Sequence, residues 1–263
     1  MNLYLIYIVS AIVGFTVPFL FVKFISWLIR RPKTYTYNEN DVWLINEFSR
    51  CNVIVFGKKG TGKDLLFSHV IALRDELHYS NIEYDENTQV VDLKDVSLGD
   101  ITFEKLVNGN YKTIEPTFEE GADIYISDGG VYLPCQYDKL LSDLYPSMPV
   151  LYALSRQLYS NNIHCNVQSL GRLWIKLREQ ADSFIRTIET QDRGDYLRVT
   201  TICYENLESA SKGLLPNSDP QFVATHGQVV RRVFKIPKGE ITYDTRYFKS
   251  ILFDKPYDPM EGL

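Results

Sequence analysis

The 263-residue sequence contains few cysteines and histidines, and it groups neither into a recognisable site. No C-x-x-C pair occurs, and the four histidines add no metal-ligand spacing. This scatter gives no sign of a disulfide framework or a zinc site, and it suits a reducing compartment. A nucleophile elbow and a dinucleotide-binding fingerprint are also missing, so nothing here indicates an enzyme outside phosphate chemistry. The four cysteines are Cys51, Cys135, Cys165 and Cys203.

Basic residues are outnumbered as well, with 28 Lys and Arg against 33 Asp and Glu, for a net charge of -5. This balance argues against a surface coated for nucleic acid, although it leaves room for a local basic loop or a ring pore that follows DNA. Apolar residues make up 45% of the chain and charged residues 23%, which is typical of a globular protein. Its length allows one α/β domain besides any membrane segment.

The N-terminus is a long apolar run, since residues 1–22 contain no charged side chain before Lys23. About 20 such residues suffice to cross a bilayer as a helix, so we predict a transmembrane anchor over residues 1–29. Pro18 is tolerated in a membrane helix, and Trp27 suits the interface. A cleaved signal peptide is the alternative, but the run lacks a basic start and a small-residue cleavage site.

The cationic residues Arg30, Arg31 and Lys33 all follow this run. By the positive-inside rule, the N-terminus is then outside, and the long C-terminal part lies in the cytoplasm below a single-pass anchor. Residues 30–50 read as a juxtamembrane connector that includes a brief helix through VWLINEF.

A strand, a glycine-rich loop and a helix follow one another directly after the connector. CNVIVF (residues 51–56) is a short apolar run typical of a buried parallel strand, and LLFSHVIALRDEL (65–77) has helical periodicity. This context predicts a phosphate loop whose backbone N–H groups wrap the β-phosphate of ATP while Lys63 bridges the β- and γ-phosphates. A chance glycine-rich turn is the alternative. The predicted nucleotide-binding residues are Gly57, Lys58, Lys59, Gly60, Thr61, Gly62, Lys63 and Asp64.

Asp64 departs from the phosphate-loop motif, which expects Ser or Thr after the lysine. The usual hydroxyl ligates Mg²⁺. A carboxylate also ligates magnesium well, but it places a negative charge beside the phosphates. The sequence therefore supports nucleotide binding better than hydrolysis.

A second apolar strand, within Ala122–Pro134, ends at Asp128. A carboxylate at the end of a parallel strand beside a phosphate loop is where a Walker B group holds Mg²⁺, so Asp64 and Asp128 are the predicted metal ligands. Many ATPases follow this Asp with a water-activating Glu, whereas this chain has Gly129 and Gly130. A turn residue before two glycines is the alternative for Asp128. Other acids that could reach in are Glu119, Glu120 and Asp138.

Downstream, a helix carrying Arg156 leads into the strand IHCNV, which is followed by Gln168. The segment Leu177–Asp182 then reads LREQAD, and the triplet YDT occurs at Tyr243–Thr245. In this order of motifs the chain resembles the zonular occludens toxin (Zot) family, the morphogenesis ATPases of filamentous phages in the FtsK–HerA branch of P-loop NTPases. The resemblance covers about residues 50–190.

The resemblance implies nucleotide contact by the phosphate loop, Mg²⁺ contact by Asp128 and γ-phosphate sensing by Gln168. Arg156 and Arg178 would act as arginine fingers toward a neighbouring subunit, and a solvated helix face is the alternative for each. The predicted catalytic set is Lys63, Asp128, Gln168, Arg156 and Arg178. Members of the family carry the membrane span after the ATPase domain, whereas this chain has it before.

The predicted fold is an α/β P-loop NTPase with a mostly parallel sheet flanked by helices, an N-terminal transmembrane helix and C-terminal antiparallel strands. Residues 51–190 form the predicted NTPase core, in which residues 79–121 hold one strand and an insertion. Residues 191–263 form a β extension and tail, because YLRVTTICYE and QVVRRVFKI alternate like paired strands. Between them, residues 208–227 read as a long loop.

Three functions remain open at this stage. The first is a homo-oligomeric ring ATPase at the host inner membrane that drives assembly and extrusion of filamentous phage with their single-stranded DNA, together with coat or envelope proteins. The second is a nucleotide-binding scaffold with weak or no hydrolysis, favoured by Asp64 and Gly129. The third is a DNA-packaging or transfer ATPase of another mobile element.

Overall fold

The computed structural model describes residues 38–91, 118–119, 121–144, 149, 152–153 and 160–238. All of them belong to the second of two units into which the chain divides, Asn38–Leu263. The predicted membrane span, Arg156 and Tyr243–Thr245 lie outside the described residues. Within the described ranges, no helix is long and apolar enough to cross a membrane.

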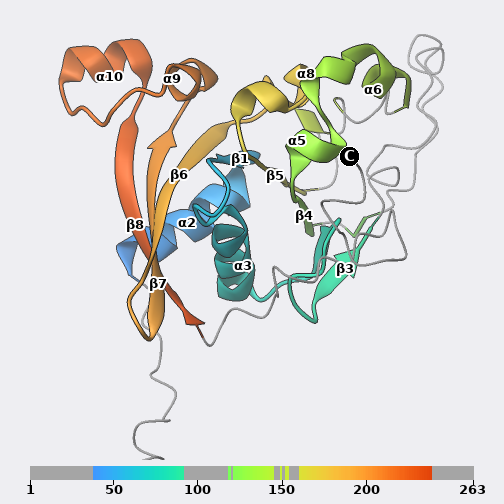
Figure 1. Cartoon of the computed structure of the whole chain (residues 1–263), viewed down its shortest axis with the longest axis horizontal. Coiled ribbons are helices and arrows are strands. Elements are labelled where there is room, and N and C mark those ends of the chain that lie inside the picture. The colour runs from blue at the N-terminus through green and yellow to red at the C-terminus, as the bar shows by residue number, and fades with distance from the viewer. Residues whose placement is uncertain are drawn as a thin grey trace, which may run out of the picture. The chain divides into compact units, whose positions relative to one another are not determined.

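An eight-stranded mixed sheet organises this unit (Figure 1), in the order β3-β2-β4-β5-β1-β6-β7-β8. The first six strands in this order are parallel, and β7 and β8 are antiparallel additions at one edge. This arrangement confirms the prediction of a mostly parallel sheet with a C-terminal antiparallel extension. The strands are β1 (Val53–Phe56), β2 (His78–Ser80), β3 (Thr88–Val90), β4 (Asp123–Ile126), β5 (Ile163–Val167), β6 (Ser183–Asp192), β7 (Tyr196–Tyr204) and β8 (Val229–Pro237).

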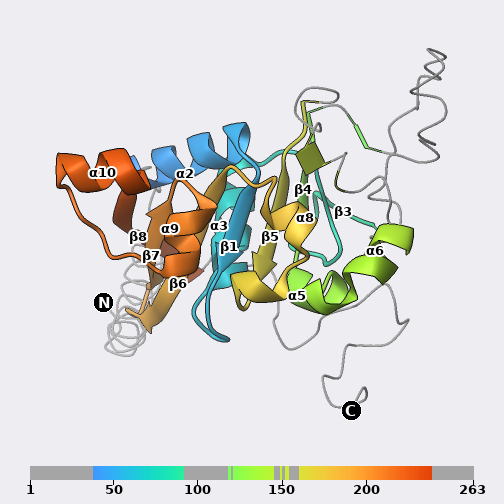
Figure 2. The same ribbon diagram turned by 90° about the horizontal axis from the view of Figure 1, so that it is seen from above.

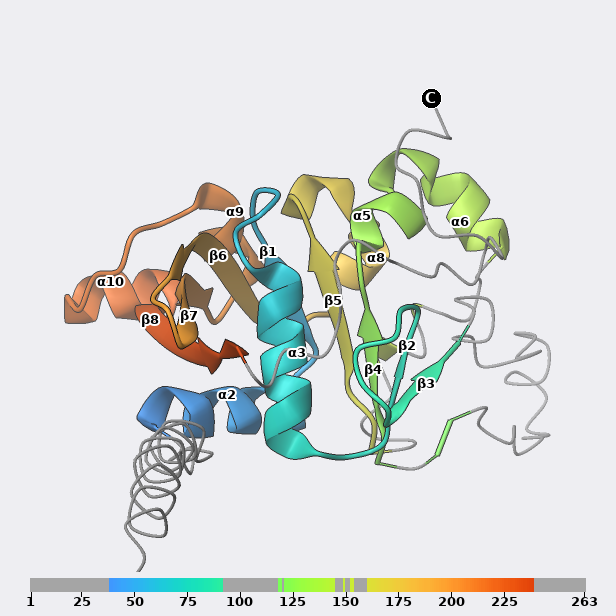
Figure 3. The ribbon, with the colours of Figure 1, turned by 60° about the horizontal axis from the view of Figure 1, so that its bottom comes forward.

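Helices cover both faces of the sheet, which is why every residue of β1, β4 and β5 is buried. On one face, Phe48 and Phe67 pack against Tyr125 and His164. These phenylalanines come from α2 (Glu39–Arg50), the brief helix predicted in the connector, and α3 (Lys63–Arg74), which lies against the strands in Figure 3. On the other face, a hydrophobic cluster joins the sheet to α5 (Gly129–Tyr132), α8 (Ile175–Arg178) and α9 (Leu207–Lys212). The helix α6 (Asp138–Leu144) contributes Leu141 to the same cluster.

Two predictions about the connections were wrong. Residues 79–121 were expected to contain one strand, whereas β2 and β3 both lie near its start and pair in parallel. The predicted long loop at 208–227 contains most of α9 and all of α10 (Pro220–His226), seen beside β7 and β8 in Figure 2. Local capping explains both helices, because Asn206 caps α9 and Asp219 caps α10, which begins at a proline.

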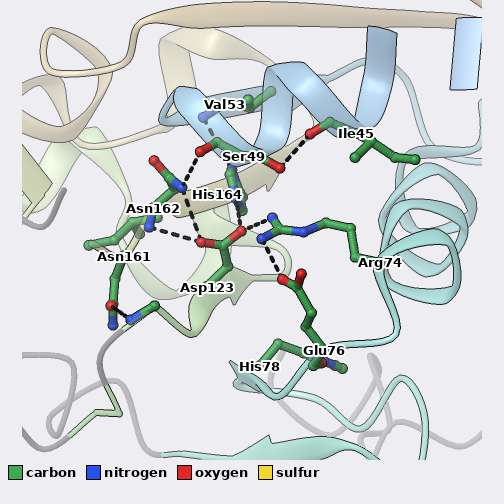
Figure 4. A network of polar contacts seen from close by, with 12 residues as sticks. Ile45, Ser49, Val53, Arg74, Glu76, His78, Asp123, Asn161, Asn162 and His164 are labelled. Atoms are coloured by element: carbon green, nitrogen blue, oxygen red, sulfur yellow. Dashed lines mark hydrogen bonds and ion pairs between the residues drawn. The ribbon is translucent and has the colours of Figure 1, made fainter. Parts of the chain in front are cut away.

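A buried network of polar side chains lies at the amino ends of β4 and β5 (Figure 4). Asp123, which is 3% exposed, accepts hydrogen bonds from Arg74, from His164 Nε2 at 3.3 Å and from the Asn162 backbone N–H at 3.0 Å. Arg74 also donates to Glu76 at 2.8 Å. The network therefore joins the last residue of α3 to the first residue of β4.

His164 holds one tautomer in this network. The Val53 backbone N–H donates to His164 Nδ1 at 3.4 Å, so Nε2 carries the proton that is donated to Asp123. Burial lowers the pKa of His164 below its ordinary 6.5, although Asp123 opposes the shift. Burial alone would raise the pKa of Asp123, but the bond from His164 and the charge of Arg74 outweigh it and leave that pKa below 3.8.

Lowering the pH from about 7 to about 5 is expected to destabilise the fold through His164. The folded-state pKa lies below the unfolded value, so the unfolded chain binds more protons in this window. The contribution of His164 to the free energy of unfolding is then fully present above pH 6.5, and it is lost as the pH falls through the folded-state pKa. Urea unfolding of the wild type and of a His164→Gln variant checks this. The variant is expected to be less stable at pH 7 but to lose less stability on acidification, and equal pH slopes would contradict the assignment.

Candidate functional site

The loop between β1 and α3 is folded over the start of α3. Gly57 donates its backbone N–H to Val167 at 3.2 Å, and Thr61 donates its N–H and its hydroxyl to the Lys58 carbonyl at 3.3 and 2.7 Å. Gly62 has a φ of 95°, and a Cβ there would lie 2.4 Å from Thr190 Oγ1. A side chain at Gly62 is thus excluded both by backbone conformation and by space.

Lys63 begins α3 and is 6% exposed. Its Nζ donates to the Lys58 carbonyl at 3.3 Å, so the ammonium bends back across the mouth of the loop. The twelve-residue helix behind it directs unsatisfied backbone N–H groups and a partial positive charge to the same place. A strand, such a loop and a helix that starts with lysine together form a cradle for a phosphate group.

Asp64 lies within this region and is held by three donors. Its Oδ1 atom accepts hydrogen bonds from Asn166 Nδ2 at 2.6 Å, Ser127 Oγ at 2.9 Å and the Tyr84 hydroxyl at 3.4 Å. The donors come from β5, from the end of β4 and from the segment after β2. Asp64 therefore joins α3 to two strands of the sheet.

Asp128 follows β4 at the same edge, with a left-handed φ of 48°. Its backbone N–H donates to Asn166 Oδ1 at 2.8 Å. Burial raises the pKa of the Asp128 carboxyl, the Asp64 carboxylate raises it further, and Lys63 and Lys59 oppose the shift. The structure thus brings together Lys63, Asp64 and Asp128, the residues that the sequence assigned to phosphate and metal.

This donor set fits Mg²⁺. Magnesium is held by one or two carboxylates together with substrate phosphates and water, rather than by a full protein cage. Two carboxylates beside a glycine-rich cradle match that pattern. Within the described ranges, no group of three or more His, Cys, Asp or Glu could form a separate metal centre.

The structure explains why no glutamate follows Asp128. A Cβ at Gly129 would lie 2.3 Å from Cys165 Sγ and 3.1 Å from Leu173 Cδ1. A Cβ at Gly130 would lie 2.9 Å from Val167 Cγ2. Position 129 therefore has no room for a side chain in this packing. Asp138, one of the acids considered as a substitute, instead accepts a hydrogen bond from Trp174 Nε1 at 2.6 Å.

A cleft of about 700 Å³ opens on the side of the loop that carries Lys58 and Thr61. Gln168 and Arg178 line it, so the structure places both beside the phosphate loop. Gln168 is exposed, and Arg178 Nη1 donates to the Leu170 carbonyl at 3.0 Å. Among the described residues that line the cleft there is no acid, and four are basic: Lys58, Arg178, Arg186 and Lys212.

Several residues of this site were missed from the sequence. Asn166 is fully buried in β5 and contacts both Asp64 and the Asp128 backbone. Ser127 is held through its backbone by Asn81, whose side chain accepts at 2.7 Å and donates at 3.1 Å. A polar residue inside an apolar strand was the available signal, because buried polar groups are hydrogen-bonded.

A central strand, a glycine-rich loop, a helix beginning with lysine and a carboxylate at a nearby strand end define a P-loop NTPase fold. Among solved structures, the chain is similar to the N-terminal domain of zonular occludens toxin from Neisseria meningitidis, with a TM-score of 0.45, 13% identity, and 72% of this chain and 95% of that chain covered. The genome packaging NTPase B204 from Sulfolobus turreted icosahedral virus 2, in complex with AMPPCP, has a TM-score of 0.40, 13% identity, and coverage of 72% and 98%. No protein-family model and no curated protein matches the sequence. The assignment of the chain to the P-loop NTPase fold therefore depends on its own phosphate loop and sheet.

Proposed function

We propose that the chain binds ATP with Mg²⁺ at the loop Gly57–Asp64 and that it works as an oligomeric ATPase. The convergence of Lys63, Asp64 and Asp128 at one edge of the sheet carries this proposal. Loop N–H groups and Lys63 would hold the β- and γ-phosphates, and the two carboxylates would hold the metal. Mg²⁺, when bound, neutralises phosphate charge and polarises the reacting phosphoryl group.

The basic cleft supports a phosphate-bearing ligand rather than a neutral one. Lys58 and Arg178 line it beside Gln168 and Thr61, and no carboxylate of its described lining opposes them. Arg178 thus lies next to the phosphate loop of its own chain. An action of Arg178 in the same subunit is therefore at least as well supported as an action toward a neighbour, which the sequence resemblance implied.

We further propose the setting that the sequence predicts. The ATPase would be tethered to the host inner membrane by the predicted N-terminal span, with the NTPase domain in the cytoplasm. As a ring it would drive assembly and extrusion of filamentous phage particles and their single-stranded DNA, alongside coat or envelope proteins. Neighbouring genes for a small coat protein and a replication initiator would favour this setting over DNA packaging or transfer for another mobile element.

A nucleotide-binding scaffold is the second candidate function. The observation that favours it is the packing of Gly129 against Cys165, which removes the position of the usual water-activating glutamate. A scaffold would bind ATP without turnover. Hydrolysis measured over a range of protein concentrations separates the two functions: turnover that rises with concentration supports a ring, and tight binding with no turnover at any concentration supports the scaffold.

Lys63→Ala is expected to weaken binding of a fluorescent ATP analogue about 10- to 150-fold, because a hydrogen-bonded charge on the phosphates is lost. The full-length chain in detergent, titrated with excess Mg²⁺, provides the measurement. Lys238→Ala is the matched control, since that lysine pairs with Asp192 at 2.7 Å on the surface. Equal affinity of the Lys63 variant and the wild type would contradict nucleotide binding at this loop.

A further inference from the structure

Asp64 presents its two carboxylate oxygens to different surroundings. All three of its hydrogen bonds, from Asn166, Ser127 and Tyr84, end on Oδ1. Among the described residues, none donates a hydrogen bond to Oδ2. Oδ1 therefore anchors the side chain to the sheet, and Oδ2 takes no part in this anchoring.

Asn166 connects this anchor to the second carboxylate. Its Oδ1 accepts the Asp128 backbone N–H at 2.8 Å, and its Nδ2 donates to Asp64 Oδ1 at 2.6 Å and to Ser127 Oγ at 3.3 Å. The backbone N–H fixes which end of the amide is oxygen. Because Asn166 is fully buried in β5, its rotation is restricted by packing. A single side chain thus contacts both the Asp64 carboxylate and the Asp128 backbone.

The two carboxylates, Asp64 and Asp128, make the binding of a triphosphate depend more strongly on the binding of a metal ion. In the usual motif, a neutral hydroxyl stands where Asp64 stands, so this position adds no negative charge beside the phosphates. Here Asp64 adds a second carboxylate beside that of Asp128, and each raises the free energy of a bound triphosphate unless a cation lies between them. Lys63 balances only part of this charge.

We propose that Asp64 makes triphosphate binding conditional on a divalent cation, and that Asn166 is the positioning residue that holds Asp64 and Asp128 together for that cation. The proposal rests on the proposed nucleotide site and specifies its regulation. Nucleotide is then bound with its metal and is released or excluded when the metal is absent.

The test compares binding of a fluorescent ATP analogue to the full-length chain in excess Mg²⁺ and in EDTA. The wild type is expected to bind about 100-fold more weakly in EDTA, because two carboxylates then repel the phosphates. Asp64→Ser restores the ordinary hydroxyl, and its loss in EDTA is expected to shrink to about tenfold or less. Wild-type affinities that are equal in Mg²⁺ and EDTA would overturn the proposal while leaving the nucleotide site standing. Absence of binding in both conditions would instead overturn the proposed function.

The role of Asn166 is tested by titrating Mg²⁺ and measuring the concentration at which binding of the fluorescent ATP analogue is half restored. Asn166→Ala is expected to raise it about 10- to 100-fold, the usual effect of losing a residue that orients metal ligands. Asn161→Ala is the matched control, since Asn161 is also a buried amide but bonds the Gly121 backbone N–H and the Glu119 carbonyl, beyond the amino end of β5 and away from Asp64. Both variants lose a buried amide, so thermal unfolding is expected to show comparable destabilisation, but the Mg²⁺ requirement of the Asn161 variant is expected to stay at the wild-type value. An equal shift in the two variants would reduce Asn166 to a structural role and overturn its assignment.

Discussion

Replacing Asp123 with alanine is expected to lower the free energy of unfolding by about 3–5 kcal/mol, the usual effect of removing one partner of a buried ion pair. The Arg74 guanidinium, 11% exposed, would lose its buried carboxylate partner and keep Glu76, which is 61% exposed. His164 would lose the acceptor of its Nε2 proton at the same time, and the Asn162 backbone N–H would lose its acceptor as well. The variant would therefore leave the donors of three residues without this carboxylate at the amino ends of β4 and β5 (Figure 4).

Denaturant unfolding of Asp123→Ala and of Asp192→Ala separates burial from ion pairing. Asp192 pairs with Lys238 at 2.7 Å but is 65% exposed, so its removal is expected to leave the unfolding midpoint nearly unchanged. A loss of stability no larger than that of the Asp192 variant would show that the network contributes little.

The sequence alone predicted those elements of the fold and the site that depend on local residue patterns. The run CNVIVF predicted β1 because a parallel strand covered on both faces has to be apolar throughout. The spacing of Gly57, Gly62 and Lys63 predicted the loop, and the packing at the two glycines leaves no space for a side chain. Asp128 was assigned to the loop's edge because parallel strands end together at the same side of a sheet.

What the sequence could not show depends on contacts between distant strands. Asn166 lies 102 positions from Asp64, and no local pattern links an amide inside β5 to a carboxylate on α3. Gln168 was predicted as the polar sensor; in the structure it is exposed at the cleft beside the phosphate loop, and its role stays a prediction. Asn166, which lies two residues earlier in β5, is the side chain that contacts Asp64 on α3, and the sequence did not single it out.

From the sequence, the absence of a glutamate at position 129 indicated a lost catalytic residue. The structure shows that the packing around Gly129 leaves no space for a side chain. Gly129→Glu is expected to destabilise the fold by about 3–5 kcal/mol, because overpacking and a buried unpaired carboxylate act together. Its Cβ would lie 2.3 Å from Cys165 Sγ, and Cys165 is fully buried. The variant is therefore expected to gain no ATP turnover, measured with Mg²⁺ beside urea unfolding.

Two further variants isolate this steric cause. Gly171→Glu is the matched control, since the nearest heavy atom to a Cβ there is Ser169 Oγ at 4.0 Å, and its stability is expected to stay within about 0.5 kcal/mol of the wild type. Adding Cys165→Ala to Gly129→Glu removes the clashing sulfur, so the double variant is expected to be more stable than the sum of the two single effects. Strict additivity would mean that Cys165 does not set the limit at position 129. A Gly129→Glu chain that folds normally and hydrolyses ATP faster would instead identify this position as a catalytic site that the chain has given up.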